Sequence, residues 1–216
     1  MCHGFGAPGD DLVGLYEELL ALAPSLGEVR FVFPAAPLSL ASMGYGDAKA
    51  WWLIDFEKIQ LLNSGDAAAL REFRNSEPEG MASARALLLK AIDELTVQTG
   101  LPMSKVVLGG FSQGAMITTD VALRLPEAPA ALAILSGTLL VEEVWAQKAK
   151  ARAGLPIFQS HGRVDPILRF EDAERLRDLL TAAGSAPQWV PFDGPHAIPH
   201  GVLQKLAAFL AVNLPV

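Results

Sequence analysis

The chain has 216 residues, of which 51% are hydrophobic and 19% charged, and its mean hydropathy is +0.30. This much apolar material can bury one large core, which excludes intrinsic disorder and favours a single domain over residues 1–216. The net charge of −7 without a Lys/Arg cluster argues against a nucleic-acid partner, and the lone cysteine, Cys2, excludes internal disulfides and a cysteine-rich zinc site.

Short apolar segments alternate along the chain with longer segments of helical period. This rhythm is typical of an α/β fold with a mostly parallel central sheet and helices on both faces. Each predicted strand is apolar on both faces, as strands between two helix layers are; they span residues 29–33, 106–109, 131–135, 156–160 and 188–191. Apolar residues at three- and four-residue spacing predict helices over residues 12–23, 81–98, 115–125, 173–183 and 203–210.

No part of the chain resembles a membrane span or a targeting signal. The longest apolar run, residues 128–141, contains Pro129 and Gly137 and is too short to cross a bilayer. The N-terminus lacks the basic and then apolar regions of a signal peptide. We therefore predict a cytoplasmic protein without a transmembrane segment.

The sequence Gly110-Phe111-Ser112-Gln113-Gly114 lies between the predicted strand 106–109 and the predicted helix 115–125. A serine at so sharp a strand-to-helix turn takes strained backbone angles that lift its hydroxyl above the sheet. The residues two before and two after the serine come close together there, and glycine avoids the clash. We predict that Ser112 is a nucleophile; the competing interpretation is an ordinary tight turn.

A serine nucleophile needs a histidine base, and a carboxylate to orient that base. In the chain order serine, acid, histidine, the remaining candidates for the base are His196 and His200. His196 follows the last predicted strand and is preferred, because His200 begins the final helix and fits a surface position. Asp165 follows the preceding strand and is the predicted acid, whereas His161 is expected to be a structural residue of the same loop.

Backbone N–H groups should stabilise the oxyanion that forms during acyl transfer. One donor is the N–H of Gln113, which follows the nucleophile. The second is assigned to Phe5, in the early glycine-rich loop of residues 3–9. A phosphate-binding interpretation of that loop fails because no Gly-Lys-Ser/Thr follows it.

Apolar segments near these motifs are candidates for a substrate pocket, and core packing is the equal alternative. Residues 34–50 form a long irregular segment rich in Pro, Gly, Ser and Met, which predicts a pocket wall. Trp51, Trp52 and Leu139 are the leading candidates for contact with substrate. The same segments also contain Leu38, Leu40, Met43, Tyr45, Leu140 and Trp145.

Together these motifs resemble the phospholipase/carboxylesterase family of α/β-hydrolases, which includes acyl-protein thioesterases and small bacterial carboxylesterases. The most specific matches are Gly110-Phe111-Ser112-Gln113-Gly114 and His161-Gly162-x-x-Asp165-Pro166. Further matches run nearly end to end: His3-Gly4-Phe5-Gly6, Pro34-Ala35-Ala36-Pro37, Ala50-Trp51-Trp52, Leu135-Ser136-Gly137 and Gly194-Pro195-His196.

The resemblance implies an α/β-hydrolase fold, a triad of Ser112, Asp165 and His196, and an oxyanion hole made by the amides of Phe5 and Gln113. It also implies that no metal or organic cofactor is needed. The chain departs from the family in having Ala115 where a second glycine is common. It also lacks the apolar strand expected before His3, and we expect that this N-terminal strand is truncated and encoded upstream of Met1.

The leading hypothesis is a carboxylesterase that cleaves esters of short to medium acyl chains through an acyl-enzyme on Ser112. Whether it also cleaves thioesters is left open. The substrate would be a small-molecule or lipid ester, and a homodimer is left open. One alternative is a dienelactone-hydrolase-like enzyme, although its nucleophile would favour cysteine and Cys2 is far from the elbow. The other is a binding protein that keeps the fold without catalysis, against which the complete triad argues.

Overall fold

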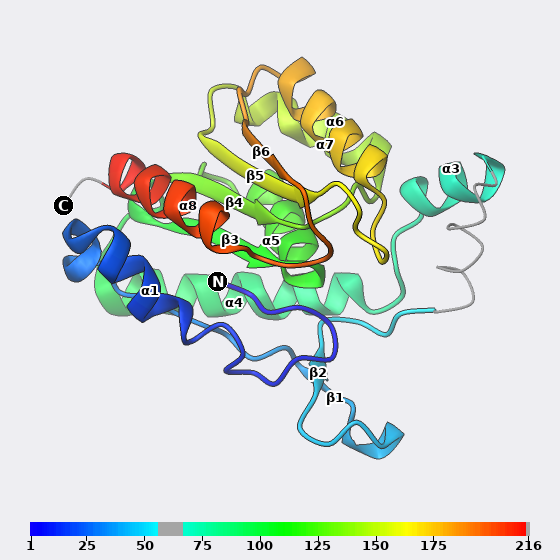
Figure 1. Ribbon diagram of the computed structural model, residues 1–216, viewed down its shortest axis with the longest axis horizontal. Helices are drawn as coiled ribbons and strands as arrows, with labels where there is room; N and C mark the ends of the chain where they lie inside the picture. Colours follow the sequence, from blue (N-terminus) through cyan, green and yellow to red (C-terminus); the bar gives the residue numbers. More distant parts are fainter. Residues whose placement is uncertain (56–66, 215–216) are drawn as a thin grey trace.

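A parallel sheet of four strands forms the centre of the molecule in the computed structural model, which describes residues 1–55 and 67–214 (Figure 1). Its strands follow one another in chain order: β3 (Val107–Phe111), β4 (Ala131–Leu135), β5 (Ile157–Gly162) and β6 (Gln188–Phe192). Ala133 of β4 pairs with Gly109 of β3 on one side and with Phe158 of β5 on the other. Four of the five predicted strands are thus confirmed, with ends that differ by at most two residues.

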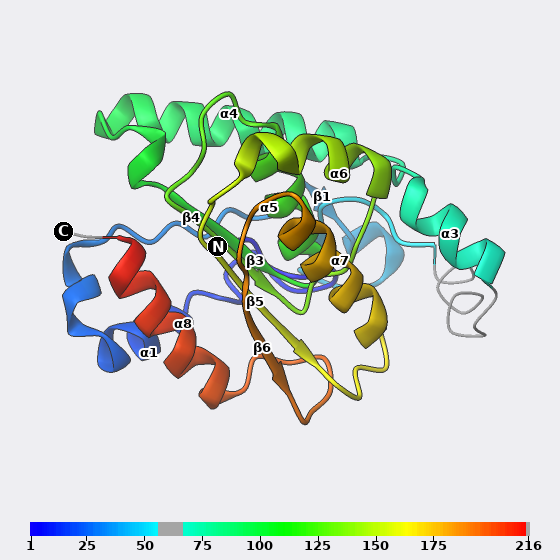
Figure 2. The same ribbon diagram turned by 90° about the horizontal axis from the view of Figure 1, so that it is seen from above.

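Helices cover both faces of this sheet, as the alternation of the sequence predicts (Figure 2). Along β4, Leu132 and Ile134 point into one apolar cluster and Ala131, Ala133 and Leu135 into another. The first cluster is completed by α4 (Met81–Thr99), α5 (Gln113–Arg124), α6 (Glu142–Ala149) and α7 (Phe170–Ala182), and the second by α1 (Leu15–Leu22) and α8 (His200–Asn213).

The remaining elements are short and lie around these layers. Helix α3 (Ala67–Asn75) contacts α6, and β1 (Leu38–Ser39) pairs antiparallel with β2 (Lys49–Ala50) in an arm that projects from the body (Figure 1). Single 3₁₀ turns span Pro24–Glu28, Ala41–Met43, Met103–Lys105 and Lys150–Arg152. Among residues 1–55 and 67–214, no helix is both long enough and apolar enough to cross a membrane.

The five predicted helices are present, with ends that differ from the prediction by up to three residues. Helix α4 ends at Thr99, and Gly100 adopts a left-handed φ of 68°, which favours glycine and ends the helix as predicted. The first helix begins at Leu15 instead of residue 12, after a series of turns that ends at Gly14. Leu12 is nevertheless buried, so its place in the apolar pattern reflects the core and not the helix.

The prediction of a strand over residues 29–33 is wrong. Within the described parts of the chain, this segment joins no ladder; the Met1 amine donates a hydrogen bond of 2.7 Å to its Val32 carbonyl. A strand is defined by a hydrogen-bonded neighbouring strand, and residues 29–33 have none within the described parts of the chain. Apolar β-branched and aromatic residues alone do not supply such a neighbour.

Residues 1 and 2 lie between that segment and the edge of β3. The Cys2 N–H donates to the Gly109 carbonyl at 2.9 Å, and the Phe111 N–H donates to the Cys2 carbonyl at 3.0 Å, which is parallel pairing. Beyond Met1 a mainly apolar cavity of about 450 Å³ continues between the same two walls; its lining includes Val29, Phe31, Val32, Val107 and Gly109. Because alternate residues of a strand face opposite neighbours, Val107 presents its N–H and C=O to the same side as Cys2.

An extension of about six apolar residues ahead of Met1 is therefore expected to raise the melting temperature. It would continue the parallel pairing of Cys2 along β3 and fill the cavity. A gain of about 1–3 kcal/mol corresponds to roughly 2–12 °C for a chain of this size. Thermal unfolding followed by circular dichroism measures the shift, and a six-residue Gly/Ser extension controls for length. Equal melting temperatures for the two extensions would show that this cavity does not accept a strand.

Candidate active site

Ser112 lies at the sharp turn between β3 and α5. Its backbone has φ 55° and ψ −121°, an unusual conformation for a residue other than glycine, and its side chain is half-buried. A Cβ atom on Gly110 would lie 2.4 Å from backbone atoms of Gly114. The close approach predicted for the two glycines of this motif is therefore confirmed.

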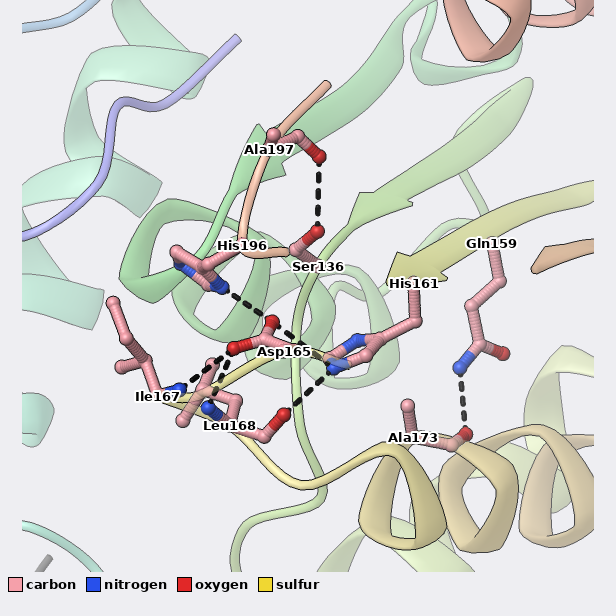
Figure 3. A network of polar contacts seen from close by, with 9 residues as sticks. All are labelled: Ser136, Gln159, His161, Asp165, Ile167, Leu168, Ala173, His196 and Ala197. Atoms are coloured by element: carbon pink, nitrogen blue, oxygen red, sulfur yellow. Dashed lines mark hydrogen bonds and ion pairs between the residues drawn. The ribbon is translucent and has the colours of Figure 1, made fainter. Parts of the chain in front are cut away.

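Asp165 and His196 meet at the carboxyl ends of the neighbouring strands β5 and β6 (Figure 3). The distance from His196 Nδ1 to Asp165 Oδ2 is 2.6 Å, a short hydrogen bond of the charge-assisted kind. The other carboxylate oxygen, Oδ1, accepts the N–H groups of Ile167 at 2.8 Å and Leu168 at 2.9 Å. The carboxylate is thus fixed on both sides.

Gly162 allows the loops that carry these residues to touch. A Cβ atom on Gly162, at the end of β5, would lie 2.3 Å from the carbonyl oxygens of Gly194 and Pro195. The Val164 N–H donates to the Gly194 carbonyl at 3.3 Å. The His-Gly-x-x-Asp and Gly-Pro-His sequences therefore pack directly against each other, and this contact places the imidazole on the acid.

The carboxyl group of Asp165 is held in its ionised form. Burial by itself would raise its pKa, but the hydrogen bonds from His161, His196 and the Leu168 N–H outweigh burial and lower the pKa well below its usual range. Asp165 consequently stays negative at neutral pH, where it can orient an imidazole and stabilise its protonated form.

The imidazole of His196 also lies close to the serine turn. Its ring centroid is 4.8 Å from that of Phe111, the residue before Ser112. Its side chain is 10% exposed, so one edge of the ring is accessible. His200, the competing candidate, is exposed at the first residue of α8.

The early glycine-rich loop packs against the same turn. A Cβ atom on Gly4 would lie 3.3 Å from the Ser112 Cβ. His3 fixes the loop, because its Nε2 accepts the Ala36 N–H at 3.0 Å, which leaves Nδ1 to donate to the Gly4 carbonyl at 2.8 Å. Phe5 follows directly and packs against the β1–β2 arm. Its N–H is thereby carried close to the turn at Ser112.

The side chain of Gln113 has a structural role that the sequence motif does not predict. Its Oε1 accepts the Trp51 N–H and its Nε2 donates to the Trp52 carbonyl, both at 2.9 Å. The Trp51 indole N–H in turn donates to the His3 carbonyl at 2.9 Å. These bonds lock the start of α5, the Trp51-Trp52 segment and the glycine-rich loop into one unit. Hydrophobic periodicity does not predict these long-range hydrogen bonds. The sequence feature that could have indicated them is a glutamine next to the predicted nucleophile.

The predicted substrate-contacting residues lie mainly inside the protein. Trp51, Trp52 and Leu139 are 3%, 4% and 0% exposed and belong to the main apolar core. Trp145 is also buried, and its indole N–H donates to Asp120 at 2.8 Å. The exposed apolar side chains of these segments lie on and beside the projecting arm: Leu38, Met43, Tyr45 and Leu53.

Across the described residues, no group of three His, Cys, Asp or Glu side chains is arranged to hold a metal ion. The chemistry assembled here is that of a serine, an imidazole and a carboxylate on adjoining loops, beside a turn with backbone N–H groups.

Comparison with known proteins places this arrangement in a family. The chain is 29% identical to acyl-protein thioesterase 1 of Eremothecium gossypii over 98% of its own length and 86% of that protein. It is also 29% identical to the protein of the same name in Neurospora crassa, over 99% and 85%. Among solved structures, esterase PE8 is 28% identical and superposes with a TM-score of 0.82, over 99% of this chain and 90% of that one.

More distant structures share the fold. Arabidopsis thaliana SOBER1 is 20% identical, with a TM-score of 0.74 over 99% of this chain and 96% of that one. The sequence profile of one family, described as phospholipase/carboxylesterase, matches residues 1–214, nearly the whole chain. The protein is therefore a hydrolase of the phospholipase/carboxylesterase family, with an α/β-hydrolase fold.

Proposed function

We propose that the protein is a serine hydrolase that cleaves carboxylic esters and thioesters of short to medium acyl chains through an acyl-enzyme on Ser112. The observation that carries the proposal is the 2.6 Å hydrogen bond between Asp165 and His196, formed beside the strained turn that presents Ser112. The thioester activity rests on the similarity to proteins named acyl-protein thioesterase.

In this mechanism the ionised Asp165 accepts the Nδ1–H of His196, so that Nε2 carries the lone pair that takes the Ser112 proton. The serine oxygen attacks the carbonyl carbon, and the oxyanion is stabilised by the N–H groups of Phe5 and Gln113. His196 then protonates the departing alcohol or thiol. A water molecule, deprotonated by the same imidazole, releases the acid and restores Ser112.

The buried Cys2 argues for serine and against the cysteine nucleophile of a dienelactone-hydrolase-like enzyme. Cys2 is 2% exposed and lies against β3, and burial raises the pKa of its thiol to about 11. The reactive form of cysteine is the thiolate, which is scarce at neutral pH under these conditions.

The proposal predicts that Ser112→Ala abolishes hydrolysis of p-nitrophenyl esters and of acyl thioesters together. Removal of a nucleophile typically lowers kcat by about 10⁵–10⁶-fold. A fluorophosphonate probe should label the native protein once, on Ser112, and leave the variant unlabelled. Cys2→Ala is the control and should retain both activity and labelling. Activity that survives Ser112→Ala, or an unlabelled native protein, would favour a binding protein or a different nucleophile.

A series of p-nitrophenyl esters tests the expected chain-length range. We expect kcat/KM to rise from the acetyl to the medium-chain esters and to fall for the palmitoyl ester. A profile that still rises at palmitoyl would assign a long-chain lipid ester as the substrate class.

A further inference from the structure

His161 is buried one residue from the end of β5 and lies on the far side of Asp165 from His196 (Figure 3). Its Nε2 is 2.9 Å from the Leu168 carbonyl and 3.3 Å from Asp165 Oδ2. Oδ2 is also the oxygen that His196 contacts, so it lies between two imidazole rings. From its place in the sequence, His161 is expected only to be a structural residue of the loop.

The protonation state of His161 follows from its partners. A carbonyl oxygen can only accept, so Nε2 must carry the hydrogen that faces Leu168. Nδ1 is buried and has no hydrogen-bond partner among the described residues. A second proton on Nδ1 would be a buried donor without an acceptor, which is unfavourable. His161 is therefore neutral and donates through Nε2 toward both Leu168 and Asp165.

This donor completes a closed arrangement around the acid. The Leu168 N–H donates to Asp165 Oδ1, while the Leu168 carbonyl accepts from His161. The turn that carries Asp165 is thus tied to strand β5 by one side chain of that strand. The His161 ring is in turn held by Phe170, whose ring centroid is 6.2 Å away in an edge-to-face contact.

We infer that His161 is a positioning residue of the hydrolytic reaction: its Nε2–H fixes Asp165 Oδ2 and thereby the orientation of the His196 imidazole. The inference rests on the proposed function. His161 does not touch the reacting atoms; it acts through the acid. Without this donor, Oδ1 is still held by the N–H groups of Ile167 and Leu168, but Oδ2 keeps only its contact with His196. The carboxylate can then shift about its anchored oxygen, and the direction of the bond to His196 is less well fixed.

The other charged groups near this network lie outside it. The Arg163 guanidinium lies over the Phe170 ring at 5.2 Å and pairs with the exposed Asp193 at 3.4 Å, and Arg169 pairs with Glu171 at 3.4 Å. All four side chains are at least one third exposed, so solvent screens them. Among the described residues, the ionisable side chains in contact with the Asp165 carboxylate are therefore His161 and His196.

The test compares His161→Phe, which keeps a ring but loses the donor, with His161→Gln, whose amide can place an N–H near the same position. For His161→Phe we expect kcat to fall by about 10- to 100-fold with KM nearly unchanged, the range expected for one hydrogen bond to a charged group. The acid limb of kcat/KM should move to higher pH, because a carboxylate that has lost a donor holds a proton on the acid–imidazole pair more tightly. His161→Gln should restore most of kcat and the original limb.

A double-mutant cycle separates positioning from simple loss of stability. In a His196→Ala background, His161→Phe should leave the residual kcat unchanged, since the imidazole through which it acts is gone. A His161→Phe variant with native kcat and an unmoved acid limb overturns the inference, as does an equal loss in both backgrounds. If His161→Phe does not fold, a His161→Gln variant that lacks kcat but melts like the native protein also overturns it. An active Ser112→Ala protein would instead refute the proposed function itself.

Discussion

Replacement of His196 by alanine is expected to lower kcat by at least about 10³-fold and to leave KM within a few-fold of the native value. The imidazole is the proposed base for Ser112. Asp165 holds its Nδ1, and its Nε2 is the nitrogen proposed to take the serine proton, so the variant has no base. Steady-state hydrolysis of a p-nitrophenyl ester at pH 8 measures the loss. Residual activity would come from the oxyanion hole and substrate binding alone.

His200→Ala is the matched control. His200 lies only four residues away, is exposed, and is the first residue of α8. Its removal should change kcat by no more than a few-fold. If His200→Ala were the inactive variant and His196→Ala the active one, the assignment of the base would be reversed, and the Asp165–His196 bond would be purely structural.

The part of the candidate active site that could be predicted from the sequence is the part in which the order of residues along the chain determines where they lie in the fold. Residues that directly follow parallel strands gather at one edge of the sheet, so the order of Ser112, Asp165 and His196 after β3, β5 and β6 was sufficient to bring the latter two together. The strands themselves were recognisable because each is a short apolar run buried on both faces.

The sequence was insufficient wherever a neighbour in space decides the outcome. Residues 29–33 have the composition of a strand but lack a ladder, because pairing depends on a segment far away in the chain. The same limit applies to the side chains of Gln113 and His161, whose hydrogen-bond partners are 61 or 62 and 7 residues away. Trp51 and Trp52 follow an irregular segment as pocket residues do, yet the folded chain buries them.

A second large effect is expected at Gly114, the second residue of α5. A Cβ atom there would lie 2.0 Å from the Cys2 carbonyl oxygen and 2.5 Å from the His3 carbonyl oxygen. Both obstacles are backbone atoms, which cannot rotate away as a side chain end can. Gly114→Ala must therefore push the N-terminal segment off the helix, and that segment both pairs with β3 through Cys2 and carries the amide of Phe5.

The expected result is a loss of stability and activity together. Forcing one extra carbon into a packed site typically costs about 1–3 kcal/mol, or more where backbone must move, which corresponds to roughly 2–12 °C in melting temperature. Displacement of the Phe5 amide would remove one of the two proposed oxyanion donors, and loss of such a donor typically lowers kcat by about 10²–10³-fold. Circular dichroism melting and ester hydrolysis below the melting temperature measure the two effects separately.

Gly201→Ala is the matched control because Gly201 is the second residue of α8 and a Cβ atom there meets nothing within 4 Å. Alanine in a helix is favoured over glycine by up to about 1 kcal/mol, so this variant should melt at the native temperature or slightly above it, with native kcat. The same chemical change in the same helical position thus has opposite expected signs, and only the backbone of Cys2 and His3 distinguishes the two sites. Equal melting temperatures for Gly114→Ala and Gly201→Ala would mean that the N-terminal segment can move away from α5 without loss of stability. In that case the segment does not hold Phe5 in register with Ser112.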